Sequence, residues 1–80
     1  MNKTVTEEYL MGITDARQSL RKVQSGQDAT YSASEVGEFV REELAGIERT
    51  IKGFPASTPV GQMLRGERDF YRNQIKRGNV

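Results

Sequence analysis

Apolar residues in the first third of the chain recur at helical spacing. Their separations of 4, 3, 4 and 3 residues place them on one face of a helix with 3.6 residues per turn. These positions are Tyr9, Ile13, Ala16, Leu20 and Val23. Thr4 and Glu7 have the spacing of an N-terminal capping box, and Gly26 fits the left-handed position that often follows a helix. The pattern predicts a first helix over about residues 5–24.

A second apolar stripe with the same periodicity follows a polar loop. Its positions are Val36, Phe39, Val40, Leu44, Ile47 and Ile51. Ser32 and Glu35 form a capping box just before the stripe, and Tyr31 stands where the outer residue of a hydrophobic staple is expected. Gly53 marks the end of the stripe. A second helix is predicted over about residues 33–52.

A third stripe occupies the C-terminal part of the chain. It consists of Val60, Met63, Leu64, Phe70, Tyr71 and Ile75. Thr58 is a suitable cap, Pro59 suits the first helical position, and Gly78 follows the stripe. These signals predict a third helix over about residues 59–77. The expected fold is therefore all-α: residues 1–80 form one domain, as a three-helix bundle or a helical hairpin plus a third helix.

Five glycines fall inside the predicted helices, at Gly12, Gly37, Gly46, Gly61 and Gly66. Each one costs roughly 1 kcal/mol relative to alanine in a helix interior, so something must offset the cost. Close approach of two helices, within one chain or between chains, is one explanation. Close approach of a ligand to the bare backbone is the other. We favour helix packing.

Composition narrows the possible functions. The chain has 80 residues, of which 35% are apolar, so its core is lean and we expect homo-oligomers. It contains no cysteine and no histidine, which removes thiol nucleophiles, the commonest general base and the commonest zinc ligands. We therefore expect a non-enzymatic binding protein with no catalytic residues, no cofactor and no metal.

The N-terminal residues and the apolar runs bear on where the protein is located. No run approaches the roughly 18 apolar residues of a membrane span. Residues 1–10 lack the basic start and apolar stretch of a signal peptide. These features predict a cytoplasmic protein without a membrane partner.

Basic residues form a stripe on another face of the third predicted helix. They follow one another at spacings of 3, 4 and 4 residues. The members of this basic stripe are Arg65, Arg68, Arg72 and Lys76. Arginine pairs with oxyanions through two parallel hydrogen bonds. Ser57, Thr58 and Gly61 lie at the start of the same helix, where backbone N–H groups attract anions. Together these residues predict a site for a phosphate-bearing ligand or another anionic partner.

The basic stripe also has a purely structural interpretation. Residues 54–80 carry five basic and two acidic side chains, although the formal net charge of the chain is only +1. The stripe is then a solvated face, or it pairs with acidic residues of a neighbouring helix and so sets the specificity between subunits. The candidate acidic residues are Glu35, Glu38 and Glu42. Both interpretations stay open from the sequence.

Phe54 stands apart from the three stripes. It lies in a Gly-Phe-Pro turn between the second and third predicted helices. The side chain either closes the end of the core or protrudes as an anchor for a partner. The sequence favours neither alternative.

Two segments resemble known families. Residues 31–36 (YSASEV) and 40–44 (VREEL) look like the second helix of ribbon-helix-helix antitoxins. That resemblance implies a DNA-binding regulator that reads DNA with a paired N-terminal strand. Residues 2–6 are short for such a strand and run directly into two glutamates. Nucleic acid is therefore possible but not the favoured partner.

Residues 54–74 (FPASTPVGQMLRGERDFYRNQ) are similar to small accessory proteins of bacteriophages and prophages. Such proteins inhibit a host or anti-phage defence protein, or sequester a signalling nucleotide, usually as helical oligomers. The resemblance implies a phage-type binding protein in the cytoplasm of a bacterial host cell. A structural phage or adaptor component is the remaining alternative.

Overall fold

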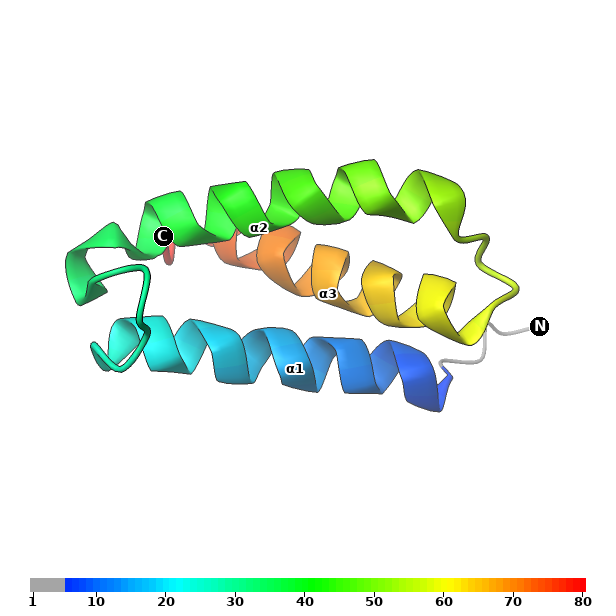
Figure 1. Cartoon of the computed structure of the whole chain (residues 1–80), viewed down its shortest axis with the longest axis horizontal. Coiled ribbons are helices and arrows are strands. Elements are labelled where there is room, and N and C mark those ends of the chain that lie inside the picture. The colour runs from blue at the N-terminus through cyan, green and yellow to red at the C-terminus, as the bar shows by residue number, and fades with distance from the viewer. Residues whose placement is uncertain (1–5) are drawn as a thin grey trace.

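The computed structural model describes residues 6–80, and these residues form three long helices and two short 3₁₀ turns (Figure 1). The long helices are α1 (Glu7–Gln24), α2 (Val36–Thr50) and α3 (Pro59–Lys76). The turns η1 (Ala33–Glu35) and η2 (Ile51–Gly53) precede and follow α2. No strand occurs within this part of the chain. The prediction of an all-α fold is confirmed.

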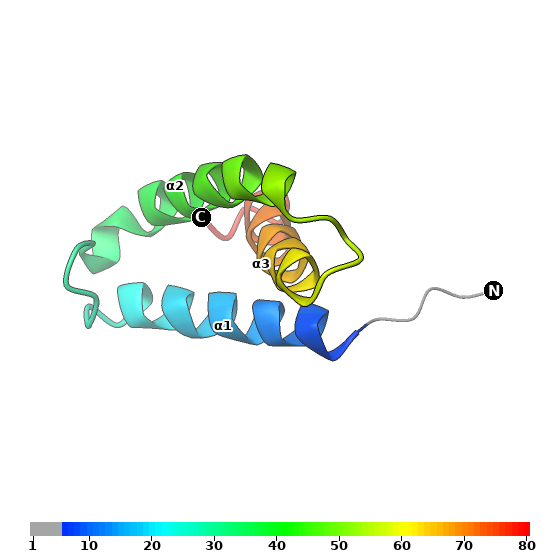
Figure 2. The same ribbon diagram turned by 45° about the vertical axis from the view of Figure 1, so that its right-hand side comes forward.

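The helices run up, down and up, and α3 lies between α1 and α2 (Figures 1 and 2). α3 packs most extensively against α1 and less against α2, whereas α1 and α2 contact each other sparsely. Short connections of this kind place consecutive helices antiparallel. α3 is therefore the central helix, and each of the other two keeps a broad outer face.

The start of α1 differs from the prediction. Thr6 is the N-cap: its backbone is extended (φ −82°, ψ 161°), and its hydroxyl accepts a hydrogen bond of 3.1 Å from the Tyr9 N–H. The helix therefore begins at Glu7, two residues later than predicted. The predicted cap, Thr4, lies outside the described residues. With this start, both Glu7 and Glu8 fall in the first turn, where the helix dipole favours negative charge.

The C-terminus of α1 is closed by Gly26, which has a φ of 77°. Its N–H bonds the Val23 carbonyl at 3.0 Å, and the next N–H, of Gln27, bonds the Lys22 carbonyl at 2.8 Å. This pair of bonds is the Schellman motif, and glycine adopts its left-handed conformation without strain. The same pair of bonds follows α3 at Gly78 (φ 75°). The predicted stop signals after both helices are confirmed.

The two other predicted starts are also confirmed. The Glu35 carboxylate accepts a 2.8 Å hydrogen bond from the Ser32 N–H, as a capping box requires. Thr58 caps α3, accepting a 3.0 Å bond from the Gly61 N–H, and Pro59 is the first helical residue. The first turn of the second helical segment is 3₁₀, and the whole segment covers residues 33–53.

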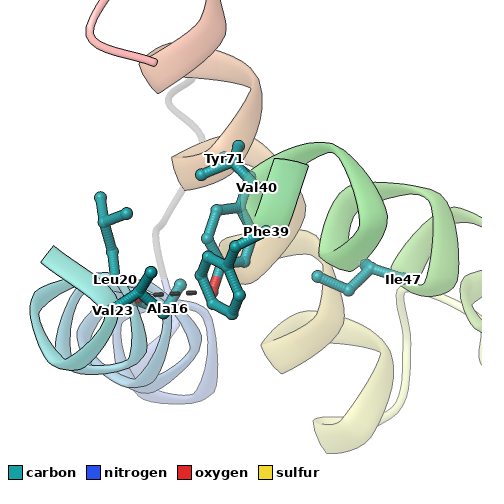
Figure 3. Close-up of a cluster of buried hydrophobic side chains, with 7 residues drawn as sticks. All are labelled: Ala16, Leu20, Val23, Phe39, Val40, Ile47 and Tyr71. Atoms are coloured by element: carbon teal, nitrogen blue, oxygen red, sulfur yellow. Dashed lines mark hydrogen bonds between the residues drawn. The ribbon is translucent and has the colours of Figure 1, made fainter. Parts of the chain in front are cut away.

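The core combines residues from all three helices (Figure 3). Its members are Ala16, Leu20, Val23, Phe39, Val40, Ile47 and Tyr71. The Phe39 ring meets the Tyr71 ring edge-on with centroids 5.9 Å apart, and it meets Tyr31 in the same way at 5.3 Å. Such pairs contribute about 0.5–1.5 kcal/mol beyond their buried area. The core residues of α1 and α2 come from the predicted apolar stripes.

The apolar stripe predicted for the third helix is only partly buried. Tyr71 is buried and Leu64 and Phe70 pack against the core, but Val60 and Ile75 are 46% and 37% exposed. The prediction that this stripe faces the core is thus wrong at its two ends. Val60 and Ile75 occupy the first and last turns of α3, beyond the cluster of buried side chains.

Glycine provides the closest contact between α1 and α3. A Cβ at Gly12 would lie 2.9 Å from the Met63 carbonyl carbon, and one at Gly66 would lie 3.2 Å from the Ile13 nitrogen. A side chain at either position would also overlap a carbonyl oxygen of the other helix, that of Met63 for Gly12 and that of Tyr9 for Gly66. The packing explanation is confirmed at these two positions, within one chain. Gly46 makes no such backbone contact.

Candidate functional site

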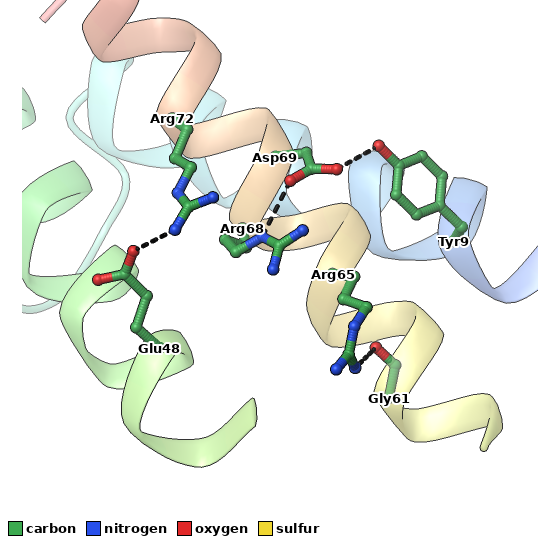
Figure 4. A network of polar contacts seen from close by, with 7 residues as sticks. All are labelled: Tyr9, Glu48, Gly61, Arg65, Arg68, Asp69 and Arg72. Atoms are coloured by element: carbon green, nitrogen blue, oxygen red, sulfur yellow. Dashed lines mark hydrogen bonds and ion pairs between the residues drawn. The ribbon is translucent and has the colours of Figure 1, made fainter. Parts of the chain in front are cut away.

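The basic stripe on α3 is built into a network of polar contacts (Figure 4). Arg65 is the residue nearest the helix start. Its Nη1 donates to the Gly61 carbonyl and to the Phe54 carbonyl, both at 2.9 Å. The guanidinium therefore joins the first turns of α3 to the preceding loop. Its role in this arrangement is structural.

Arg68 joins α3 to α1 through a carboxylate. Its Nε lies 2.9 Å from Oδ1 of Asp69, and Oδ2 of Asp69 accepts a 2.6 Å hydrogen bond from the Tyr9 hydroxyl. The hydrogen bond to Asp69 raises the pKa of Tyr9, and partial burial raises it further. Tyr9 and Asp69 are 60 positions apart in sequence, so this row of polar contacts depends on how α1 and α3 pack.

Arg72 joins α3 to α2. Its Nη2 lies 2.9 Å from Oε2 of Glu48, and the two side chains are 55% and 44% exposed. Within its own chain Arg72 therefore pairs with Glu48 of the neighbouring helix. The three acidic residues considered as partners between subunits, Glu35, Glu38 and Glu42, are exposed.

The Tyr31 hydroxyl donates to the Glu42 carboxylate on the exposed side of α2. This hydrogen bond and the neighbouring glutamates raise the pKa of Tyr31 to about 12. The Glu42 carboxylate is therefore hydrogen-bonded to a residue from the loop before α2. The acidic side of α2 and the basic stripe of α3 form separate surfaces.

The start of α3, where an anion site was predicted, is largely hydrogen-bonded within its own chain. The Thr58 hydroxyl accepts from the Gly61 N–H and donates to the Pro55 carbonyl at 2.7 Å. Pro59 has no N–H, and the Gln62 N–H bonds the Thr58 carbonyl at 3.0 Å. Most donors of the first turn are therefore satisfied within the chain. Ser57 is exposed beside them.

The last turn of α3 divides its basic residues between two surfaces. Lys76 is exposed and continues the basic stripe. Arg77 instead lines a depression of about 250 Å³ between α1 and α3, together with Arg17. Arg17 stacks over the Phe70 ring, 5.7 Å from its centroid. No local pattern in the sequence indicates this depression, because its walls come from both ends of the chain.

Phe54 lies on the surface at the turn between η2 and α3. Its side chain is 38% exposed and lies outside the core cluster. Its backbone is fixed by the bond from Arg65 and by its own N–H, which bonds the Ile51 carbonyl at 3.1 Å. The arrangement favours an exposed anchor over a plug of the core.

Carboxylates from α1 and α2 influence the pKa of Glu67 on α3. Burial raises the pKa of Glu67, and the charges of Asp15 and Glu43 raise it further. Within residues 6–80, no group of three or more acidic side chains is close enough together to hold a metal ion. No helix in the described part of the chain has both the length and the apolar character needed to cross a membrane.

Comparisons of this chain with protein-family models, characterised proteins and solved structures find no match.

Proposed function

We propose that this chain is a non-enzymatic binding protein of the phage accessory type, which inhibits a host or defence protein by docking onto an acidic surface of it. The contact surface is the outward side of α3, with Arg72 and Lys76 at its centre and Arg68 beside them. The observation that carries the proposal is the exposure of this basic row: the Arg72 side chain remains 55% exposed even while it pairs with Glu48.

The shape of the surface favours a macromolecular partner. Sites for small ligands are concave and bury most of the ligand. The two depressions described for this chain are lined by other residues, on the outer side of α1 and between α1 and α3. The basic stripe is convex, as expected for a helix that meets another protein. A nucleotide bound there would stay largely in water.

The existing ion pair does not prevent docking. Exposed pairs such as Arg72–Glu48 contribute only about 0–1 kcal/mol, so a partner carboxylate can replace Glu48 at little cost. Arg65 is different, because it holds two backbone carbonyls inside its own chain. We therefore assign Arg72 and Lys76 to the partner and Arg65 to the fold.

The test uses the tagged chain expressed in bacterial cells. Proteins that co-purify with wild type are compared with those from Arg72→Glu/Lys76→Glu and from the matched control Arg49→Glu/Lys52→Glu, which makes the same charge change on α2 and η2. A protein retained by wild type and control but lost from the first variant supports the proposal. Identical retention by all three chains contradicts it.

A thermal-shift panel of nucleotides separates the two branches of the phage-type hypothesis. Stabilisation by a nucleotide, lost in Arg72→Glu/Lys76→Glu, would replace protein inhibition by nucleotide sequestration. An absence of stabilisation together with no retained protein would favour a structural or adaptor role.

The DNA-binding alternative has one feature in its favour. Of the segments that resemble the second helix of ribbon-helix-helix antitoxins, residues 33–36 and 40–44 lie in η1 and α2 and are helical. Residues 6–80 contain no strand, and a strand for reading DNA would have to come from residues outside the described part. Binding to duplex DNA that weakens as salt rises would support this alternative.

A further inference from the structure

The outer face of α1 carries large apolar side chains that the fold does not use. Leu10 and Met11 are 52% and 53% exposed, more than any other large apolar residue in the described chain. They line a shallow depression of about 390 Å³ with Glu7, Thr14 and Asp15. All five residues belong to one helix, so no other part of the described chain covers them. The core side of α1 lies on the opposite face.

Charge is distributed along the middle line of this face in a simple order, with Asp15 to one side of that line. Glu7, Thr14 and Arg21 follow one another at intervals of seven residues, which is close to two helical turns, so they lie nearly in line. All three are exposed. The line therefore starts with a negative side chain, passes a small neutral one beside Leu10 and Met11, and ends with a positive one. We call this line with its two apolar neighbours the α1 outer face.

Such an order is complementary to itself. If two copies lie antiparallel with their Thr14 residues opposite each other, Leu10 and Met11 of each copy lie on either side of this centre and pack against the partner's α1. The Glu7 end of each copy then lies beside the partner's Arg21, and the long arginine side chain tolerates small changes of register. A parallel alignment would instead place like charges together. Two-fold symmetry of this kind is the commonest arrangement of soluble homo-oligomers.

We propose that the α1 outer face binds a second copy of this chain and forms an antiparallel homodimer. Leu10 and Met11 supply the apolar contacts on either side of Thr14, and the two Glu7–Arg21 pairs set the direction. The 18 residues of α1 span only about 27 Å, so the interface is small and the dimer is weak. α3 lies on the other side of α1, and its basic stripe stays available in the dimer.

The test is the molar mass in solution by sedimentation across the micromolar range. For wild type, the mass should rise with concentration from 9.0 kDa towards twice that value. Glu7→Lys alone and Arg21→Glu alone should each stay monomeric, because each variant places like charges at both ends of the interface. An equimolar mixture of the two variants should form a heterodimer, because opposite charges then meet at both ends.

Recovery in the mixture cannot come from misfolded chains, so it separates a lost contact from a lost fold. Met11→Glu should abolish association in every combination, and the control Arg49→Glu on α2 should associate as wild type does. The proposal is overturned if wild type stays monomeric, if either single variant associates normally, or if the mixture does not associate. These outcomes leave the proposed role of α3 untouched, since that role concerns a different helix.

Discussion

Gly12 of α1 and Gly66 of α3 form a reciprocal contact, in which each glycine faces the backbone of the other helix. A Cβ on Gly12 would lie 3.1 Å from the Glu67 nitrogen, and a Cβ on Gly66 would lie 3.0 Å from the Tyr9 carbonyl carbon. Both residues are buried. The central helix is thus held to α1 by direct contact between backbones, and a methyl group at either position forces the helices apart.

This contact predicts that Gly12→Ala and Gly66→Ala destabilise the protein although alanine is the better helix former. Overpacking against backbone atoms typically costs about 1–3 kcal/mol in the free energy of unfolding. The control is Gly46→Ala, whose Cβ would meet only the end of the Arg49 side chain, at 3.7 Å. We expect it to stabilise the protein by up to about 1 kcal/mol. Urea unfolding measures all three, and equal effects at Gly12 and Gly46 would contradict the packing explanation.

Two arginines of the basic stripe should differ in their effect on stability. Arg65→Ala removes two hydrogen bonds to backbone carbonyls, and we expect it to lower the free energy of unfolding by about 1–3 kcal/mol. Arg72→Ala removes one exposed ion pair and should lower it by no more than about 1 kcal/mol. Urea unfolding of both variants checks the order. A larger loss for Arg72→Ala would show that the assignment of Arg65 to the fold is incorrect.

The tyrosines should ionise at a higher pH in the folded chain than in the unfolded chain. Hydrogen bonds to carboxylates raise the pKa of Tyr9 and raise that of Tyr31 to about 12, while burial raises the pKa of Tyr71. A raised folded-state pKa stabilises the protein below the ordinary value of 10.0, and this stability is lost as the pH rises through the folded-state pKa. The free energy of unfolding should therefore fall above pH 10.

Absorbance at the phenolate band measures this titration directly, because the chain contains no tryptophan. The folded protein should give a midpoint above that of the urea-unfolded protein. Tyr31→Phe should remove one of the three phenols, and the other two should still ionise at a higher pH in the folded protein than in the unfolded protein. Coincident titrations of folded and unfolded chain would contradict the prediction.

Glu67 should make stability depend on pH in the acid range. Its pKa is raised by burial and by Asp15 and Glu43, so its neutral form is favoured in the folded state. The stabilisation is complete below the unfolded-state pKa and is lost as the pH rises through the folded-state pKa. Glu67→Gln should therefore be more stable than wild type at pH 7, with the difference disappearing at low pH. A difference that is constant with pH, measured by urea unfolding, would exclude this origin.

Local signals allowed the helices to be predicted from the sequence. The cap at Thr58, the Ser32–Glu35 box and the glycine after each of two helices act within a few residues, so the structure reproduces them. The missed boundary is the start of α1, where two threonines two residues apart compete for the cap and Thr6 takes it. Neighbouring residues alone do not decide between them.

The partners of the side chains in the candidate site could not be predicted from the sequence. The spacing of the basic stripe was readable from the helical period, but the destinations of its side chains were not. Arg65 bonds a carbonyl 11 residues away, and Arg72 pairs with a carboxylate 24 residues away. Such partners depend on where a second element lies, so no pattern within one helix identifies them. Leu10 and Met11 lie off the apolar stripe of α1, and their exposure follows from that position.

The sequence by itself determined the helical class, the positions of the helices and the apolar faces of α1 and α2, because short-range hydrogen bonds and a 3.6-residue period govern them. The tertiary structure alone decided that α3 is the central helix, that Gly12 and Gly66 face each other's backbones and that Asp69 joins Tyr9 to Arg68. The last two relationships join α1 to α3 across more than 50 positions of sequence. They follow from the mutual fit of complete helix surfaces, which no local pattern contains.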